Sequence, residues 1–137
     1  MKALFRLSLF AALLLVLSCS LLPNHKDDFA KKNDDFMLRV RWLDFQGASL
    51  HFDEENRQKL VEQFADNEDL KVTDFSMTRL DIDVPNEKVT AHYRLQYYML
   101  PSATVETERF TLTWEQRSGE DSAMAYWRIV ESFPELD

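Results

Sequence analysis

The sequence predicts an α+β domain in which two helices precede and pack on a curved, four-stranded antiparallel meander. Apolar residues between positions 33 and 65 recur at the 3.6-residue spacing of helices. From residue 70 onward, the chain carries four segments rich in β-branched and aromatic residues. The connections between these segments are too short for parallel crossovers, so consecutive strands should be antiparallel neighbours.

The first predicted helix covers residues 33–52 and is apolar on two nearly opposite faces. A helix of this kind is normally buried between other elements, so we expect it to be sandwiched within the fold. Gly47 lies on one of the two stripes, which suggests close approach of another backbone. The stripes comprise Phe36, Val40, Leu43, Gly47 and Leu50, and Leu38, Trp42, Phe45, Ser49 and Phe52.

The second predicted helix runs from Glu54 to about Ala65. Asp53 is a suitable N-cap, because its carboxylate can accept hydrogen bonds from the backbone N–H groups of the first turn. Acidic residues in that turn also interact favourably with the helix dipole. Apolar residues occupy one side of this helix, so we expect it to lie on the outside of the domain.

The remainder of the chain has the composition of strands separated by turns. The second strand alternates apolar and polar residues, whereas the third places Glu106 and Glu108 on the same face as its apolar residues. Such mixed faces indicate a long sheet that helices cover over part of its length. The strands are predicted at residues 70–84, 88–100, 104–117 and 123–133, with turns at Pro85-Asn86, Pro101-Ser102 and Ser118-Gly119-Glu120.

This order of elements resembles the cone-shaped fold of the nuclear transport factor 2-like superfamily over roughly residues 31–133. The local patterns that carry the resemblance are Arg41-Trp42-Leu43-Asp44-Phe45, Leu70-Lys71-Val72-Thr73-Asp74-Phe75 and Trp127-Arg128-Ile129-Val130. The resemblance implies a cone with a cavity but no single activity, since the fold hosts isomerases, dehydratases, transport adaptors and domains without known chemistry. The candidate cavity residues are Trp42, His92, Tyr97 and Trp114.

The N-terminal segment has the parts of a secretory signal. Lys2 and Arg6 precede an apolar run that ends near Leu17 and is too short to span a bilayer. Cys19 follows directly; it is the one cysteine of the chain and so has no partner for an internal disulfide. We therefore predict a signal peptide at residues 1–18, a tether at 19–30 and a single domain at 31–137.

The motif Val16-Leu17-Ser18-Cys19 resembles the lipobox of bacterial lipoproteins. The resemblance implies cleavage before Cys19 and attachment of lipid chains, such as palmitate, which would hold the protein on a membrane of the cell envelope. In a Gram-negative host, Ser20 after the cysteine implies the periplasmic face of the outer membrane. The alternative is an ordinary or uncleaved signal with an incidental cysteine.

The charge of the chain argues against two classes of partner. Loss of residues 1–18, which include Lys2 and Arg6, lowers the net charge from −8 by two more, to −10. Such a surface repels nucleic acid and is not attracted to anionic lipid headgroups. Membrane attachment must therefore come from the lipid on Cys19.

Catalytic and metal-binding motifs are missing from the sequence. The two isolated glycines cannot form a phosphate-binding loop, and no serine lies in a Gly-x-Ser-x-Gly elbow. The histidines are not at ligand spacing from one another, and residues 81–86 lack the glycine of a calcium loop. We expect neither a metal nor a cofactor, and His92, on the polar face of its strand, is expected to be solvated.

We therefore expect a non-catalytic module that binds a small apolar ligand or an envelope protein. One alternative is an acid–base enzyme, similar to isomerases or dehydratases, in which His92 and a carboxylate such as Glu106 or Glu108 converge in a closed pocket. The other is a structural component of an envelope assembly. We also expect a weak homodimer through the sheet, built on an uncovered apolar area from Phe110, Leu112, Trp114, Trp127, Ile129 and Phe133.

Overall fold

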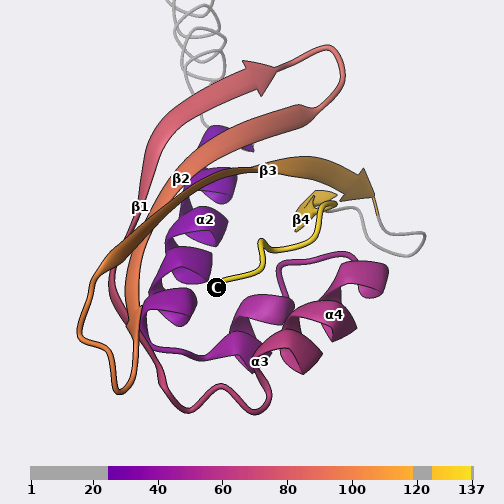
Figure 1. The fold of residues 1–137 in the computed structure, drawn as a ribbon. Coiled ribbons are helices and arrows are strands. Elements are labelled where there is room, and N and C mark those ends of the chain that lie inside the picture. Colours follow the sequence, from indigo (N-terminus) through magenta and orange to yellow (C-terminus); the bar gives the residue numbers. More distant parts are fainter. Residues whose placement is uncertain (1–24, 119–124, 137) are drawn as a thin grey trace, which may run out of the picture.

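The computed structural model describes residues 25–118 and 125–136, which form an α+β fold (Figure 1). Consecutive strands pair antiparallel in the order β1-β2-β3-β4, which confirms the predicted class and sheet. The signal peptide, Cys19 and the turn at Gly119-Glu120 lie outside the described residues. The elements are α2 (His25–Arg41), α3 (Phe45–Ser49), α4 (Glu54–Phe64), β1 (Leu70–Asp83), β2 (Lys88–Met99), β3 (Glu106–Ser118) and β4 (Ala125–Ile129).

The single helix predicted at residues 33–52 is wrong, because the chain forms two helices with a break at Leu43. Leu43 has a left-handed φ of 59°, which a right-handed helix cannot contain. Asp44 then caps α3, its Oδ1 accepting a hydrogen bond from the N–H of Gly47 at 2.9 Å. At the other end, α2 begins at His25 and buries Phe29, so the fold starts within the segment predicted as tether.

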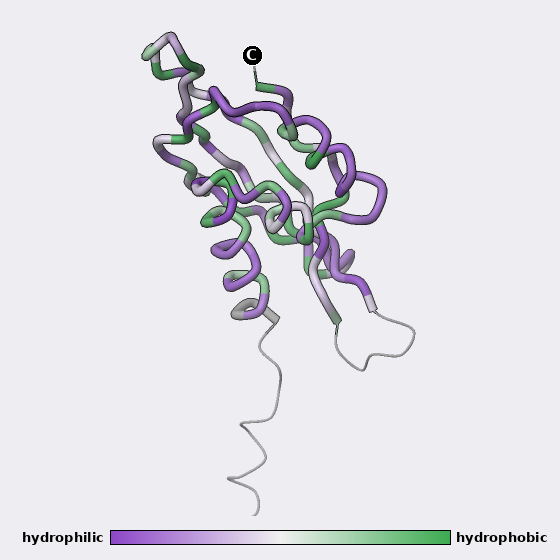
Figure 2. Tube along the Cα trace, turned by 90° about the horizontal axis from the view of Figure 1, so that it is seen from below, coloured by the Kyte–Doolittle hydropathy of each residue, from purple (hydrophilic) through white to green (hydrophobic). Residues whose placement is uncertain are grey.

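Only one face of α2 is buried, although two apolar stripes were expected. Phe36 and Val40 are fully buried, whereas Leu38 is 53% exposed and Trp42, in the turn after the helix, is 78% exposed. The helix itself lies on the hollow side of the sheet (Figure 1). Hydrophobic and hydrophilic residues alternate along it (Figure 2). The break at Leu43 divides the second stripe: Leu38 and Trp42 before it are exposed, whereas Ser49 and Phe52 after it are buried. None of the described helices is long and apolar enough to cross a bilayer.

The prediction for α4 is confirmed. Asp53 accepts a hydrogen bond from the N–H of Asn56 at 3.0 Å, and Leu60 and Phe64 are buried on one side. Asn56 also fastens the C-terminal segment, because its Nδ2 donates to the carbonyl of Val130 at 3.1 Å.

Two bulges in β1 explain why its apolar residues do not simply alternate. The register with β2 shifts at Thr73 and again at Thr78, where one extra residue enters β1. The hydroxyls of these threonines donate to the carbonyls of Gln96 and His92 on β2, at 3.0 and 3.2 Å. After each bulge the apolar residues return to the face that carries the helices, and the strand bends.

The alternation predicted for β2 is confirmed, since its apolar face is buried from Val89 to Tyr97. The pairing with β3 places Leu112 and Trp114 on that buried face, while Glu106 and Glu108 stand on the same face toward its exposed end. The face of β3 is therefore mixed, as expected.

The predicted fourth strand is too long, because the chain leaves the sheet after Ile129. Residues 51–53 pair with the end of β4. The N–H of Ile129 donates to the backbone carbonyl of His51 at 2.8 Å, and the N–H of Asp53 donates to the carbonyl of Ile129 at 2.9 Å. The chain beyond crosses the hollow side of the sheet (Figure 1) and buries Phe133 beside Phe36. The C-terminal segment therefore covers part of the hollow side of the sheet, which the sequence analysis had assigned to the helices alone.

Candidate functional site

A cavity of about 400 Å³ lies between the first turns of α2 and the β1–β2 hairpin. Its interior is formed by buried or half-buried side chains, and its mouth by exposed ones. The interior residues are Phe29, Asn33, Met77, Leu80, Val89, Gln116 and Trp127. The mouth residues are Ala30, Asp34, Ile82, Asp83, Val84, Glu87 and Lys88.

The second bulge of β1 is what builds one wall of this cavity. Without an extra residue at Thr78, strict alternation from Met77 would turn Leu80 and Ile82 to the outer face of the sheet. With it, Ile82 faces inward opposite Val89. On α2, Phe29 and Asn33 are four residues apart and so project from the same face toward that wall.

A buried series of hydrogen bonds holds Asn33, one of the two polar residues of the interior beside Gln116. The indole N–H of Trp114 donates to the hydroxyl of Tyr93 at 3.0 Å, and this hydroxyl donates to Asn33 Oδ1 at 2.5 Å. Burial raises the pKa of Tyr93, so the hydroxyl stays protonated and continues to donate. Each of these three side chains has a hydrogen-bond partner, which indicates that the network has a structural role.

Trp127 forms an apolar wall of the cavity. The residue is 6% exposed and meets the ring of Phe29 edge-on, with 5.5 Å between centroids. Its Nε1 is buried, and no acceptor for it is found in the described part of the chain. A buried N–H without an acceptor costs roughly 1–3 kcal/mol, so this wall carries a local cost in stability.

The mouth of the cavity is acidic. Asp34, Asp83 and Glu87 are exposed around it, and Lys88, the one cation among the described residues of the lining, lies 2.6 Å from the carboxylate of Glu115. Glu115 is also paired with Arg117 at 2.7 Å, so it offsets the charge of Lys88 only in part. The three carboxylates outnumber this cation, which leaves a net negative charge at the opening.

The structure brings none of the four predicted cavity residues to this cavity. Trp42 is exposed in the turn after α2, and Trp114 is fully buried in the core. Tyr97 is buried at the far end of β2, with its hydroxyl 3.4 Å from Glu106. His92 lies on the outer face of the sheet. The sequence pattern identified the aromatic and polar positions but not the cavity, which depends on Phe29 and on the bulge in β1.

His92 has a carboxylate partner, but not the one that was expected. Its Nε2 lies 2.8 Å from Asp81 Oδ2, and Asp81 is also bonded by Arg79. The hydrogen bonds from His92 and Arg79 lower the pKa of Asp81. Both members of the pair are partly exposed, while Glu106 and Glu108 lie on the opposite face of the sheet. The pair therefore lacks the enclosed pocket that acid–base catalysis on an apolar substrate would need.

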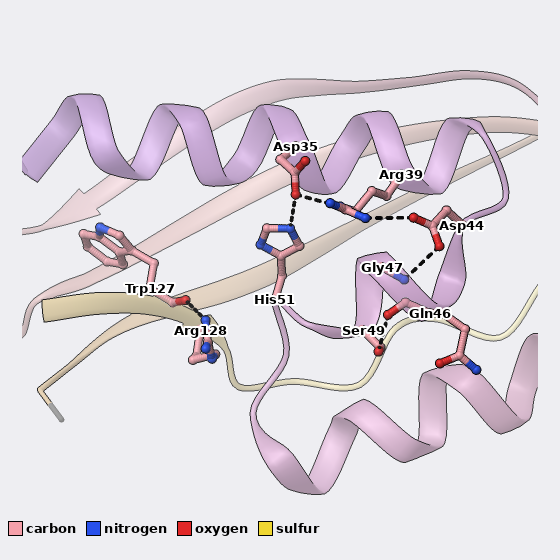
Figure 3. Close-up of polar contacts among 9 residues, drawn as sticks. All are labelled: Asp35, Arg39, Asp44, Gln46, Gly47, Ser49, His51, Trp127 and Arg128. Carbon is pink, nitrogen blue, oxygen red and sulfur yellow. Dashed lines mark hydrogen bonds and ion pairs between the residues drawn. The ribbon is translucent and has the colours of Figure 1, made fainter. Parts of the chain in front are cut away.

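A second cluster, which the sequence did not indicate, joins α2 to the break and to α3 (Figure 3). Asp35 Oδ2 lies 2.7 Å from His51 Nε2 and accepts a hydrogen bond from Arg39 Nε at 2.7 Å. Arg39 also donates to Asp44 at 2.8 Å. The i, i+4 spacing of Asp35 and Arg39 was a visible signal for one of these contacts, whereas His51 gave none.

This cluster acts as a structural clamp. The hydrogen bond from Arg39 lowers the pKa of Asp35, with a further contribution from His51. Burial lowers the pKa of His51, and Asp35 opposes that effect. Within residues 25–118 and 125–136, no three acidic, histidine or cysteine side chains gather where they could hold a metal ion.

Comparisons with known proteins identify a similar fold but no function. No protein-family model matches the sequence, and no curated protein matches it either. A crystal structure of a SEC-C motif containing protein from Psychrobacter arcticus has a similar fold, with a TM-score of 0.54 and 6% sequence identity. The match covers 72% of this chain and 56% of that chain, so this chain spans little more than half of that protein. At such identity the likeness concerns the fold alone, and function has to be argued from the cavity.

Proposed function

We propose that this protein is a lipid-anchored component of the cell envelope whose domain binds a small apolar ligand without catalysis. The observation that carries the proposal is the cavity of about 400 Å³ beside α2, lined mainly by apolar side chains. Cavities of roughly 300–1,000 Å³ with this lining are typical of small-molecule sites. The two histidine–carboxylate pairs lie outside the cavity lining, so a binding role accounts for the geometry better than an acid–base enzyme does.

The proposed anchor lies close to the cavity along the chain. Five residues lie between Cys19 and His25, where α2 begins, and the six residue steps from Cys19 to His25 span at most about 22 Å. Phe29 and Asn33 then follow within the first turns of the helix. A lipid on Cys19 would therefore keep the cavity near the membrane surface, on the periplasmic face of the outer membrane if the host is Gram-negative.

The position of the helices supports a second part of the proposal, that the fold is a cone of the nuclear transport factor 2-like type. The helix α2 and the C-terminal segment occupy the hollow side of the curved meander, as a cone requires (Figure 1). An experimental structure superposed on members of that superfamily tests this part.

The anchor is tested by fractionation and mass spectrometry. We expect a mature N-terminus at an acylated Cys19 in the membrane fraction, and release of the Cys19→Ser variant into the soluble fraction. A Cys19→Ser variant that is still cleaved and still wholly membrane-bound would refute the anchor.

The ligand site is tested by blocking its mouth. Ala30 is exposed on α2 and lines the cavity, so Ala30→Trp should close the mouth with little effect on the core. Lys31→Trp, at an exposed position next to it but outside the cavity lining, is the matched control. We expect Ala30→Trp to reduce binding of dodecyl maltoside below its micelle concentration, measured by calorimetry, and Lys31→Trp to preserve it. Equal binding by both variants would remove the proposal, as would a parent protein that binds neither dodecyl maltoside nor a charged amphiphile of the same chain length.

A weak homodimer through the sheet stays a prediction, but the apolar area that was expected to form its interface is largely buried within the single chain. Five of the six residues expected to form an uncovered patch are buried within the single chain: Leu112, Trp114, Trp127, Ile129 and Phe133. A pair would have to use the polar outer face instead. Sedimentation at low and high salt tests whether it forms.

A further inference from the structure

We propose that the ligand of this cavity is a single-chain amphiphile with a cationic head group. The inference rests on the proposed binding function and adds the chemical class of the ligand. The alkyl chain would lie in the apolar interior, and the positive charge would lie at the acidic mouth.

The interior selects an alkyl chain. Phe29, Leu80, Val89 and Trp127 offer it apolar surface, and the polar atoms of Asn33 are engaged with Tyr93 and with the sulfurs of Met37 and Met77. No charged side chain of the described chain lies in the buried part of the cavity lining. A charged head group would lose its hydration there without a partner, so it must stay at the mouth.

The carboxylates at the mouth of the cavity favour a head group with a positive charge. Asp34 comes from α2, Asp83 from the end of β1 and Glu87 from the following turn, so three separate points of the chain place carboxylates around one opening. Neither Asp34 nor Glu87 forms an ion pair with another described residue, and Lys88 is engaged by Glu115. An anionic head group, such as that of a fatty acid, would be repelled, whereas a cation would be attracted.

The carboxylate of Asp83 and the backbone of Glu87 are held in place before any ligand arrives. Asp83 accepts a hydrogen bond from Asn86 Nδ2 at 2.8 Å, and the N–H of Gln116 donates to the carbonyl of Glu87 at 3.0 Å. The turn is thereby tied both to itself and to β3. A site that is already ordered loses less entropy on binding.

The ring of Trp127 lines the cavity and adds apolar surface to it, while its Nε1 is buried. The recognition of a ligand therefore depends on the apolar interior and on the charge at the mouth. Lauroylcholine combines a twelve-carbon chain with a quaternary ammonium, and is therefore a suitable probe.

The test compares head groups on chains of one length. The protein is the chain 19–137 with Cys19→Ser, which contains every described residue and stays in solution without its lipid. Titration calorimetry below the micelle concentrations measures lauroylcholine, dodecyl maltoside and sodium laurate at low and high ionic strength. We expect lauroylcholine to bind about tenfold more tightly than laurate, and the difference to shrink with salt.

Two double variants with the same net charge test whether the preference for lauroylcholine depends on the acids at the mouth of the cavity. Asp34→Asn with Glu87→Gln should remove most of the preference for lauroylcholine. Asp66→Asn with Glu68→Gln changes exposed acids outside the cavity lining and should preserve it. Equal loss in both pairs would assign the preference to overall charge and overturn the inference.

The outcomes separate this inference from the proposed function. Binding of dodecyl maltoside or laurate as tight as that of lauroylcholine, still blocked by Ala30→Trp, would overturn the cationic class and leave the binding function standing. Absence of binding by all three amphiphiles would overturn both.

Discussion

His51 Nε2 lies 2.7 Å from Asp35 Oδ2, and this contact joins the end of the α3 region to the middle of α2 across a break in the helical chain. The imidazole is buried against the rings of Phe36 and Trp114, while the carboxylate is shared with Arg39. The contact therefore stabilises a chain reversal that local sequence does not specify.

Stability should fall on acidification, and His51 should account for the first part of the loss. Burial lowers the pKa of His51 below its ordinary value of 6.5, so the unfolded chain takes up this proton first as the pH falls. The stability that neutral His51 contributes is fully present above about pH 6.5. It is lost as the pH falls through the lower pKa that His51 has in the folded protein. The lowered pKa of Asp35 adds a further loss below 3.8. Midpoints of urea denaturation, measured from pH 8 to pH 4, should show the loss due to His51 in the unmodified protein.

In His51→Gln, the fall in the urea midpoint between pH 8 and pH 4 should disappear. In His92→Gln, at a position on the outer face of the sheet, it should be retained. A fall that persists in His51→Gln would assign it to another group.

Gly47→Ala should destabilise the protein, although alanine is normally the better helix former. A Cβ at Gly47 would collide with the guanidinium of Arg39 and the carboxylate of Asp44, which are hydrogen-bonded to each other. We expect a loss of about 0.5–2 kcal/mol in the free energy of unfolding, from chemical denaturation, because the displaced Asp44 carboxylate would no longer cap α3. Gln46→Ala, exposed on the same helix, should stay within about 0.5 kcal/mol of the parent. A gain in stability in Gly47→Ala would show that the clamp is not formed.

Tyr93→Phe should cost more than the loss of an ordinary hydroxyl. It removes the acceptor of the Trp114 indole and the donor to Asn33, and leaves both groups buried. We expect a loss of about 1–3 kcal/mol in the free energy of unfolding. Tyr98→Phe, on the outer face of the same strand, is the matched control and should have little effect. Equal effects of the two substitutions would contradict the buried network.

Phe29→Ala should show that α2 belongs to the core from its first turns. Phe29 packs edge-on against Trp114 and Trp127, each with 5.5 Å between ring centroids. Its truncation should cost about 3–5 kcal/mol, whereas a residue in a solvated tether would cost nothing. Leu38→Ala, on the exposed face of the same helix, is the control. A thermal midpoint of Phe29→Ala equal to that of the parent would restore the predicted tether.

Much of the secondary structure could be predicted because it depends on near neighbours. The alternation of β2 follows from residues two apart, and Asp53 caps α4 through an N–H three residues away. The class of the fold and the antiparallel order followed from such patterns and from the short turns between strands. These features involve interactions within one element or between consecutive ones.

The break at Leu43, the register of β1 and the cavity were decided by the tertiary structure. Two apolar stripes were compatible with one long helix, whereas the contacts of Arg39 with Asp44 and of His51 with Asp35 favour the turn. The bulge at Thr78 turns Leu80 inward toward Phe29, which lies about fifty positions earlier in the chain. Each of these outcomes depends on burial shared between distant segments, and periodicity within a short window carries no record of which segments will meet.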